Sequence, residues 1–174
     1  MMSRIEAGLV LIDVDFHSSR YAFVDSDRVT PIELGFGWMF RDLATSDRHF
    51  IGRRAIEREL REGTSRWKTI GLLIDWDDWD RRYRAEGIIP PKDLTPVTYE
   101  MMLYDDNGER VGFTTSFMYS PVLQRHIAMG RVRPGLGKLG TRVNLEVTIN
   151  HQYQNVSAEV ARTPLFNPAR KTAL

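Results

Sequence analysis

The sequence predicts an α+β chain whose C-terminal part is a small antiparallel barrel or sandwich. Two observations carry this prediction. The chain changes character near residue 66, with helix and turn signals before it and alternating strand patterns after it. The alternating segments are short and are separated by turn signals, as in small barrels and sandwiches. With 174 residues, the chain is long enough to bury roughly two-thirds of its unfolded surface without disulfides.

The first half of the N-terminal part contains three local signals. The apolar run over residues 9–12 suits a buried strand or the end of a helix. Residues 30–33, Thr-Pro-Ile-Glu, form a capping box with proline at the first helical position, and the glycines that follow limit it to one short turn. The aromatic cluster over residues 36–40 then predicts a core strand.

Residues 53–62 predict an amphipathic helix. Ala55, Ile56 and Leu60 recur at helical spacing, and Arg and Glu occupy the other face. Glu57 and Arg61 stand four apart in the favourable order, and Gly63 suits the position just after the helix.

The C-terminal part predicts a series of short strands. A strand over residues 67–75 comes first, and an irregular stretch over residues 76–96 follows it. Asn-Gly within residues 105–108 predicts a hairpin turn. Ser120-Pro121 resembles a helix cap and its first position, and residues 134–137 form a turn. The remaining predicted strands are residues 97–104, 111–116, 127–132, 143–149 and 156–161, the last two joined by a loop over residues 150–155.

The composition excludes several classes of protein. Lys and Arg total 24 against 23 Asp and Glu, so the chain is no strongly basic nucleic-acid binder. The absence of cysteine excludes disulfides, thiolate metal sites and cysteine nucleophiles, and fits a reducing cytoplasm. No apolar run approaches the roughly 18 residues that span a bilayer, and Met1-Met2-Ser3-Arg4 lacks a signal-peptide core. We therefore expect a soluble cytoplasmic protein without a membrane or nucleic-acid partner.

Few residues point to chemistry by themselves. The four histidines stand at no metal-ligand spacing, so no metal site is expected, and no GxSxG motif marks a nucleophilic serine. Residues 135–140 resemble a dinucleotide fingerprint but open no helix, and predict a turn. Residues 75–84 mix tryptophans with both charges and suit a lid, an oligomer contact or a substrate wall.

Glu6 is the one candidate binding residue. It precedes an apolar run, and a carboxylate buried there needs hydrogen-bond partners. One interpretation pairs it with Arg4. The other places it against a heterocycle that offers two N–H donors, such as an amino-pterin edge, which a carboxylate accepts in bidentate fashion.

A set of short motifs, collinear over nearly the whole chain, resembles the aminomethyltransferase family, which comprises the glycine cleavage T-protein and its tetrahydrofolate-dependent relatives. The motifs are Arg4-x-Glu6-Ala7-Gly8-Leu9, Asp15, Thr30-Pro31-x-Glu33-x-Gly35, Trp38, Phe50-Ile51-Gly52, Gly108-x-x-Val111-Gly112-x-x-Thr115-Ser116, Ser120-Pro121, Ile127-Ala128-Met129-Gly130 and Gly140-x-x-Val143.

The resemblance implies two domains and one cofactor. Residues 1–65 would be the C-terminal part of a folate-binding α+β domain, and residues 66–174 the family's antiparallel C-terminal β-barrel. The cofactor would be tetrahydrofolate, with Glu6 holding the pterin ring, while Asp15, Glu33 and Trp38 match motif positions of structural character. The family's aspartate near folate N5 falls in an N-terminal half outside this sequence, so no catalytic residue is assigned.

Two departures from glycine cleavage enzymes and one similarity favour one branch of the family, the demethylases of methoxylated aromatic acids. Ile12-Asp13 stands where glycine cleavage enzymes usually carry Tyr-Gly, and residues 76–94 form an insertion. The ending over residues 163–171 is similar to the tail of such demethylases. The implied partners are a small methyl or aminomethyl donor and either a chain supplying the N-terminal half or a second copy. The alternatives are a non-catalytic binding or assembly module and, less favoured, a barrel that binds oligonucleotides.

Overall fold

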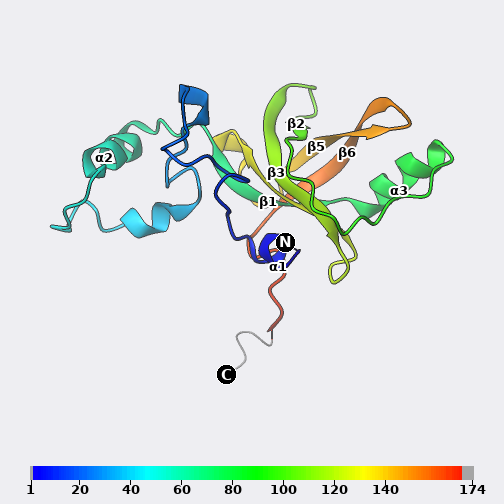
Figure 1. Cartoon of the computed structure of the whole chain (residues 1–174), viewed down its shortest axis with the longest axis horizontal. Coiled ribbons are helices and arrows are strands. Elements are labelled where there is room, and N and C mark those ends of the chain that lie inside the picture. The colour runs from blue at the N-terminus through cyan, green and yellow to red at the C-terminus, as the bar shows by residue number, and fades with distance from the viewer. Residues whose placement is uncertain (1, 170–174) are drawn as a thin grey trace.

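The computed structural model describes residues 2–169 and shows a closed barrel with an N-terminal segment that runs beneath and beside it (Figure 1). All neighbouring strands of the barrel are antiparallel, in the order β1-β4-β3-β2-β5-β6. The strands are β1 (Lys68–Ile74), β2 (Met102–Tyr104), β3 (Arg110–Ser120), β4 (Arg125–Val132), β5 (Arg142–Ile149) and β6 (Gln152–Ala161). The predicted α+β class is confirmed, and of the two architectures left open the barrel is the one formed.

Strand alternation and turn chemistry explain the barrel. In β5, Val143, Leu145, Val147 and Ile149 alternate with more exposed residues and point into the core. The predicted Asn-Gly hairpin joins β2 to β3, with Gly108 at a φ of 78° that favours glycine. The last hairpin is tighter than predicted, because Asn150 and His151 adopt left-handed φ angles and β6 begins at Gln152.

Helix α1 (Met2–Ala7) packs on the outer face of β3 and β4. Ile5 of the helix contacts a small apolar cluster with Met118, Ile127 and Met129 of these strands. The central barrel core lies on the other face of the same strands. Strand β3 is therefore buried on both faces over most of its length, and it extends four residues beyond the predicted end at residue 116.

The prediction of an irregular stretch over residues 76–96 is wrong for residues 76–85, which form helix α3 (Trp76–Ala85), and holds for residues 86–96, which lie in no helix or strand. Asp75 caps the helix, its carboxylate accepting the N–H groups of Asp77 and Asp78 at 3.0 Å each. Acidic residues occupy the first turn and arginines the last, in the order that the helix dipole favours. The Asp78 carboxylate also accepts the Ser157 N–H at 2.8 Å and so fixes the helix to β6.

Two predictions for the N-terminal segment are also wrong. The run over residues 9–12, predicted as either a buried strand or the end of a helix, forms neither: it follows the end of α1, and its leucines and isoleucine are exposed. The aromatic residues over Phe36–Phe40 form a 3-10 helix, η2, in which Trp38 is 62% exposed. In both places local hydrophobicity suggested burial, but the described chain offers no surface that covers these side chains.

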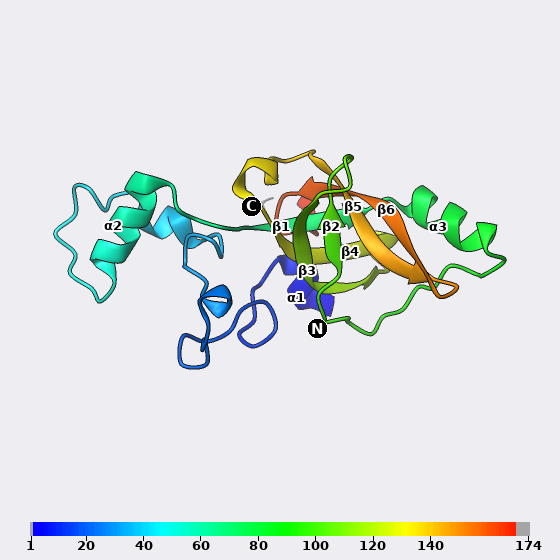
Figure 2. The same cartoon turned by 90° about the horizontal axis from the view of Figure 1, so that it is seen from above.

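The other local signals of this segment mostly hold. Thr30 and Glu33 form the predicted capping box, at 3.1 and 3.2 Å, around a short turn. Helix α2 (Arg53–Glu62) has the predicted bounds and ends at Gly63. Its Glu57 pairs with Arg53 at 2.7 Å instead of with Arg61. The short 3-10 helix η1 (Asp25–Asp27) lies between α1 and η2, and α2 lies well away from the barrel (Figure 2).

Two further turns complete the fold. Ser120-Pro121 begins a turn before β4 and no helix, with the Ser120 hydroxyl accepting the Leu123 N–H at 3.2 Å. The predicted turn over residues 134–137 is the 3-10 helix η3 (Pro134–Leu136) and its last residue. Over residues 2–169, no helix is long and apolar enough to cross a membrane. Met1 and residues 170–174, the latter including the end of the tail motif, lie outside the described residues.

Candidate functional site

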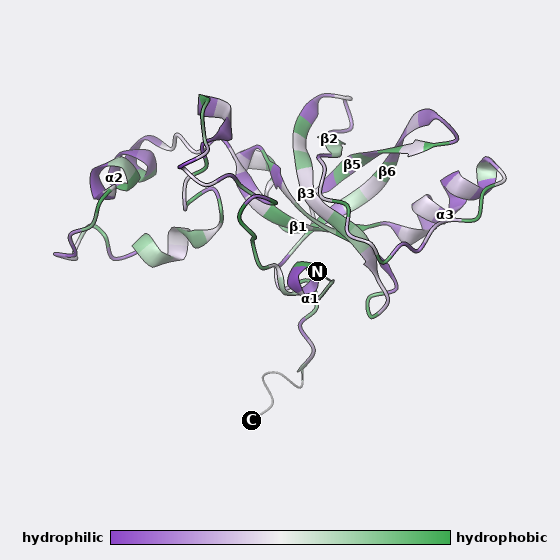
Figure 3. Ribbon diagram, viewed as in Figure 1, coloured by the Kyte–Doolittle hydropathy of each residue, from purple (hydrophilic) through white to green (hydrophobic). Residues whose placement is uncertain are grey.

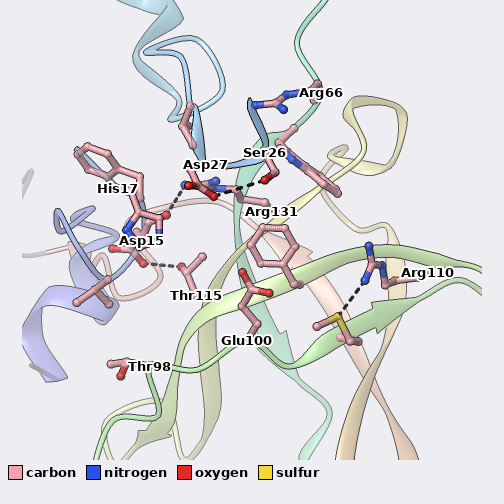
Figure 4. A pocket seen from close by; sticks show the side chains of 16 residues that line it. Asp15, His17, Ser26, Asp27, Arg66, Thr98, Glu100, Arg110, Thr115 and Arg131 are labelled. Atoms are coloured by element: carbon pink, nitrogen blue, oxygen red, sulfur yellow. Dashed lines mark hydrogen bonds between the residues drawn. The ribbon is translucent and has the colours of Figure 1, made fainter. Parts of the chain in front are cut away.

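A cavity of about 470 Å³ lies between the N-terminal segment and the barrel (Figure 4). One wall comes from the segment between α1 and the capping box, and the opposite wall from β2, β3, β4 and the residues before β1. The residues that line the cavity are Val14, Asp15, Phe16, His17, Ser26, Asp27, Val29, Arg66, Trp67, Thr98, Glu100, Met102, Arg110, Phe113, Thr115 and Arg131.

Asp15 holds the two walls together. Its side chain is almost fully buried and accepts hydrogen bonds from the Leu11 N–H at 2.7 Å and the Ser116 hydroxyl at 3.1 Å. The Thr115 hydroxyl donates to the same carboxylate, and Arg131 donates to the Asp15 carbonyl oxygen. A buried carboxylate with this many donors fixes the loop that follows α1 against β3 and β4.

Arg4 supplies the charge that balances Asp15. Its guanidinium forms a buried ion pair with Asp15 and also donates to Ser116 and to the Leu9 carbonyl oxygen. The alternative in which Arg4 pairs with Glu6 is therefore wrong. The reason is that Arg4 points across the interface into the barrel, whereas the Glu6 side chain meets a different residue of β3.

Glu33 supports the cavity by fixing the residues that precede β1. Its carboxylate is 2% exposed and accepts the N–H groups of Arg66 and Trp67 at 2.7 and 3.2 Å, besides closing the capping box. Its carbonyl oxygen accepts from Thr69. One residue thus fixes the backbone of Arg66 and Trp67, two cavity residues, to the turn over residues 30–35.

Three arginines give the cavity its electrostatic character. Burial lowers the pKa of Arg131, although the carboxylates of Glu33, Asp15 and Glu100 oppose this shift. Arg131 lies 5.9 Å over the Phe113 ring, and Trp67 meets Phe113 edge to face at 5.2 Å. Arg66 and Arg110 reach the same cavity from its more open side. The carboxylates of Asp15, Asp27 and Glu100 line the same cavity and balance the three arginines. The rings suit a planar ligand, and Arg66 and Arg110 on the open side suit an anionic group of it.

The cavity offers binding groups rather than an activated nucleophile. Among its described lining residues, no hydroxyl is hydrogen-bonded to a histidine. Residues 2–169 also contain no group of three or more His, Asp or Glu side chains placed to hold a metal ion. The arrangement can position a bound molecule and neutralise its charge.

Glu6, the predicted binding residue, lies outside this cavity. It stands near the end of α1, half-buried, and its Oε1 accepts a hydrogen bond from the Ser120 hydroxyl at 2.6 Å. Its carbonyl oxygen accepts the Phe166 N–H at 3.0 Å. The second carboxylate oxygen accepts no hydrogen bond from residues 2–169.

The sequence patterns did not mark Arg131, Arg66, Arg110 and Trp67 as site residues. Arg131 had a usable signal, because a charge between Gly130 and Val132 in an otherwise apolar strand requires a partner. Arg66 lies just before β1 and Arg110 is the first residue of β3. An arginine at the start of a strand gives no signal of a site, so only the tertiary structure brings these two together.

Comparison with known protein families shows what the barrel is similar to. Residues 87–167 match the model of the glycine cleavage T-protein C-terminal barrel domain. The glycine cleavage T-protein relationship extends beyond these residues, because distant aminomethyltransferase homologues align with most of the chain.

Relatives of the barrel and its N-terminal segment come from diverse organisms. An aminomethyltransferase of Synechococcus sp. (strain RCC307) is 31% identical over 83% of this chain, which is 32% of the relative. A mitochondrial aminomethyltransferase of Pisum sativum is 28% identical over 82% of this chain and 28% of its own length. The chain thus spans about a third of the length of the curated relatives it matches.

A solved structure shares the fold. The glycine cleavage system aminomethyltransferase T from Bartonella henselae superposes with a TM-score of 0.66, over 94% of this chain and 37% of the other, at 23% identity. The relationship to T-protein predicted from the short motifs is confirmed at this level.

Proposed function

We propose that this chain is the C-terminal part of a tetrahydrofolate-dependent one-carbon transferase. The activity moves a methyl or aminomethyl group from a small donor to tetrahydrofolate. The collinear similarity to aminomethyltransferases over most of the chain is the observation that carries this proposal. In it, residues 1–65 contribute the end of the folate-binding domain and residues 66–174 contribute the barrel.

Glu6 is the proposed contact to the pterin ring. The hydrogen bond from Ser120 holds Oε1 in place, so the carboxylate is oriented before a ligand arrives. The other oxygen, which accepts no hydrogen bond from residues 2–169, can accept an N–H of an amino-pterin edge. Two acceptor oxygens on one rigid group match two adjacent donors of a heterocycle, which is the reason for preferring Glu6 to an exposed carboxylate.

The cavity beneath the N-terminal segment suits the acidic end of the same cofactor. Arg66 and Arg110 carry guanidinium groups that bind carboxylates, and Trp67 and Phe113 supply flat apolar walls. Such contacts orient a ligand and neutralise its charge. Orientation of donor and acceptor supplies a large part of the rate in a transfer of this kind.

For the donor we favour a methoxylated aromatic acid, as in O-demethylation, over the aminomethyl donor of glycine cleavage. The support is the departure at Ile12-Asp13, the tail over residues 163–171 and the insertion at residues 76–94, which carries α3. The two final residues of the tail motif, 170 and 171, lie outside the described residues. A cytoplasmic location is likewise part of the proposal, and two of the relatives are mitochondrial forms.

The partner in this proposal is either a chain that supplies the other part of the folate-binding domain or a second copy. The exposed apolar side chains of the N-terminal segment, among them Phe23, Trp38 and Ile51, favour such a partner. The second candidate function, a binding or assembly module without catalysis, shares these surfaces but predicts no use for Glu6.

The decisive measurement is a calorimetric titration of the chain with tetrahydrofolate, with native mass measured on the same sample. We expect Glu6→Gln to weaken tetrahydrofolate binding by about 1–3 kcal/mol, roughly 5- to 150-fold, because a polar pair loses its charge and one acceptor. Glu62→Gln, at the exposed end of α2, is the control and should leave the affinity unchanged.

Each result of the titration separates the candidate functions. Binding that weakens in Glu6→Gln supports the transferase and the pterin contact. Equal affinity of both variants contradicts the role of Glu6. A folded chain that binds no tetrahydrofolate, alone or with a partner chain encoded beside it, favours the assembly module.

A further inference from the structure

A second cavity, of about 480 Å³, lies between α3, the segment that follows it and the barrel. Its residues come from every strand except β1. They are Trp79, Tyr83, Pro91, Asp93, Val97, Tyr99, Glu100, Met101, Met102, Phe117, His126, Glu146, Val147, Thr148 and Tyr153. Only Glu100 and Met102 also line the first cavity, so the two sites present different chemistry.

Aromatic rings form the inner wall of this second cavity. The Trp79 ring centroid lies 4.9 Å from that of Tyr83 and 4.1 Å from that of His126. Phe117 stacks on His126 at 4.9 Å with an interplanar angle of 8°. Tyr99 and Tyr153 are exposed and stand at the rim. This lining offers ring faces to an apolar or cationic group.

Two polar atoms of the same wall lack partners. Trp79 Nε1 and His126 Nδ1 are buried, and neither has a hydrogen-bond partner within residues 2–169. Their side chains are 3% and 2% exposed. Burial lowers the pKa of His126 to about 4, so its imidazole is neutral near pH 7 and one ring nitrogen is an acceptor. Buried polar groups normally have partners, so the imidazole of His126, which can accept, points to a ligand group that donates a hydrogen bond. The Trp79 N–H is itself a donor that a cation does not satisfy, and Trp79 offers a cation only its ring face.

The charges around the cavity are negative. Asp93, Glu100 and Glu146 contribute carboxylates, and no lysine or arginine is among the described lining residues. Hydrogen bonds from Thr95 lower the pKa of Asp93, which is therefore ionised at neutral pH. This field disfavours anions, including the carboxylates of a folate or of a benzoic acid.

The outer side of the same aromatic cluster already holds an ammonium group. Lys92 Nζ lies 5.0 Å from the Trp76 ring centroid and 5.5 Å from that of Tyr119. Both rings contact His126, at 6.0 and 5.3 Å. The three carboxylates outnumber this one lysine, so the cavity still favours a cation.

We propose that the cavity between α3 and the barrel binds a small organic ammonium ion with an apolar body. Trp79, Tyr83, Phe117 and the rim tyrosines receive the apolar body and the cation on their ring faces. The ammonium N–H donates to His126, and the carboxylates balance its charge. This site is separate from the tetrahydrofolate contact proposed above and needs neither that cofactor nor the donor of the transfer reaction.

The test uses the full chain without folate and three probes of equal shape: phenethylammonium, phenethyl alcohol and phenylacetate, all at pH 7. The readouts are calorimetry and the indole N–H resonances of the four tryptophans, which distinguish Trp79 from the other three. We expect phenethylammonium to bind most tightly and to shift the Trp79 indole signal. The alcohol should bind at least fivefold more weakly, and phenylacetate should not bind measurably.

Two variants locate the site on the cavity rim, where folding is least at risk. Tyr153→Ala removes an exposed ring, and Asp93→Asn removes one charge while keeping an acceptor for Thr95. Each should weaken phenethylammonium binding at least fivefold. Tyr21→Ala, an exposed tyrosine of the N-terminal segment, is the matched control and should bind as the parent chain does.

Equal affinity for the amine and the alcohol would contradict the proposal that the site recognises a charge. Tighter binding of phenylacetate than of phenethylammonium would contradict the proposal that this charge is positive. A chain that binds no phenethylammonium, or binds it with an unmoved Trp79 signal, would overturn the site itself. Because tetrahydrofolate is absent from every arm, these results are independent of those for the proposed transferase.

Discussion

Individual side chains decide how the N-terminal segment is attached to the barrel. Asp15 and Arg4 form a buried pair that joins α1 and its following loop to β3 and β4. Removing one member of such a pair leaves an uncompensated charge, whose cost exceeds the net value of the pair. These residues therefore fix the geometry of the cavity wall more than they add to its stability.

His126 makes stability depend on pH. Its pKa is about 4 in the folded chain and about 6.5 when unfolded, so between these values the unfolded state binds more protons. The free energy of unfolding should therefore fall as the pH drops from about 6.5 to 4, by up to about 3 kcal/mol in total. Urea unfolding at several pH values measures this slope.

Two variants test whether this change of the free energy of unfolding with pH comes from His126. His126→Phe keeps an aromatic ring in the cluster and should remove this part of the pH dependence. His49→Phe, at an exposed histidine, should retain the slope of the parent chain. Parallel slopes for the parent and His126→Phe would refute a neutral buried imidazole.

At the scale of the elements, close contact between β3 and β4 shapes the barrel. Gly112 and Gly130 face the opposite strand so closely that a Cβ would meet backbone: at 112 it would lie 2.1 Å from the Arg131 carbonyl oxygen, and at 130 it would lie 2.6 Å from that of Phe113. Backbone atoms of paired strands cannot move aside as a flexible side chain can. The strands can pair here only with glycine at both positions.

Gly112→Ala is therefore expected to lower the free energy of unfolding by about 3 kcal/mol or more, since the strands must separate to admit the methyl group. Gly135→Ala is the control, because nothing lies within 4 Å of its added Cβ; it should change stability by less than about 0.5 kcal/mol. Chemical denaturation of both variants checks this, and equal midpoints would show that the barrel admits the added carbon.

On the scale of the whole molecule, the barrel and the N-terminal segment differ in how well they are covered. The barrel has a continuous core closed by α3 at one side and α1 on its outer face. The segment around η2 and α2 extends away from it (Figure 3). In the N-terminal segment, the side chains of Phe23, Trp38 and Ile51 are exposed. Large apolar side chains that are exposed in this way favour contact with another protein surface.

We expect the isolated chain to self-associate through this segment, so its mean mass should rise with concentration in light scattering or sedimentation. Ile51→Lys should reduce the association because it places a charge on the exposed surface. Ile89→Lys changes an equally exposed isoleucine of the segment after α3 and should have no such effect. A parent chain that stays monomeric at all concentrations would contradict the prediction.

The sequence alone determined those features that depend on neighbours along the chain. The capping box at Thr30, the helix over residues 53–62, the Asn-Gly hairpin and the alternating strands rest on hydrogen bonds and side-chain periods within a few residues. The short collinear motifs of the sequence were enough to predict the similarity to T-protein. Helix α3 was missed because its aromatic positions at helical spacing lie among charges of both signs.

Only the tertiary structure decided which side chains meet. It pairs Arg4 with Asp15 instead of Glu6, and it brings Arg66, Arg110 and Arg131 to one cavity from three separate stretches of chain. It also leaves Trp38 in solvent, where hydrophobicity predicted a core strand. The physical reason is common to all three: burial and charge pairing depend on which surfaces the closed barrel places opposite one another, and no local pattern encodes that.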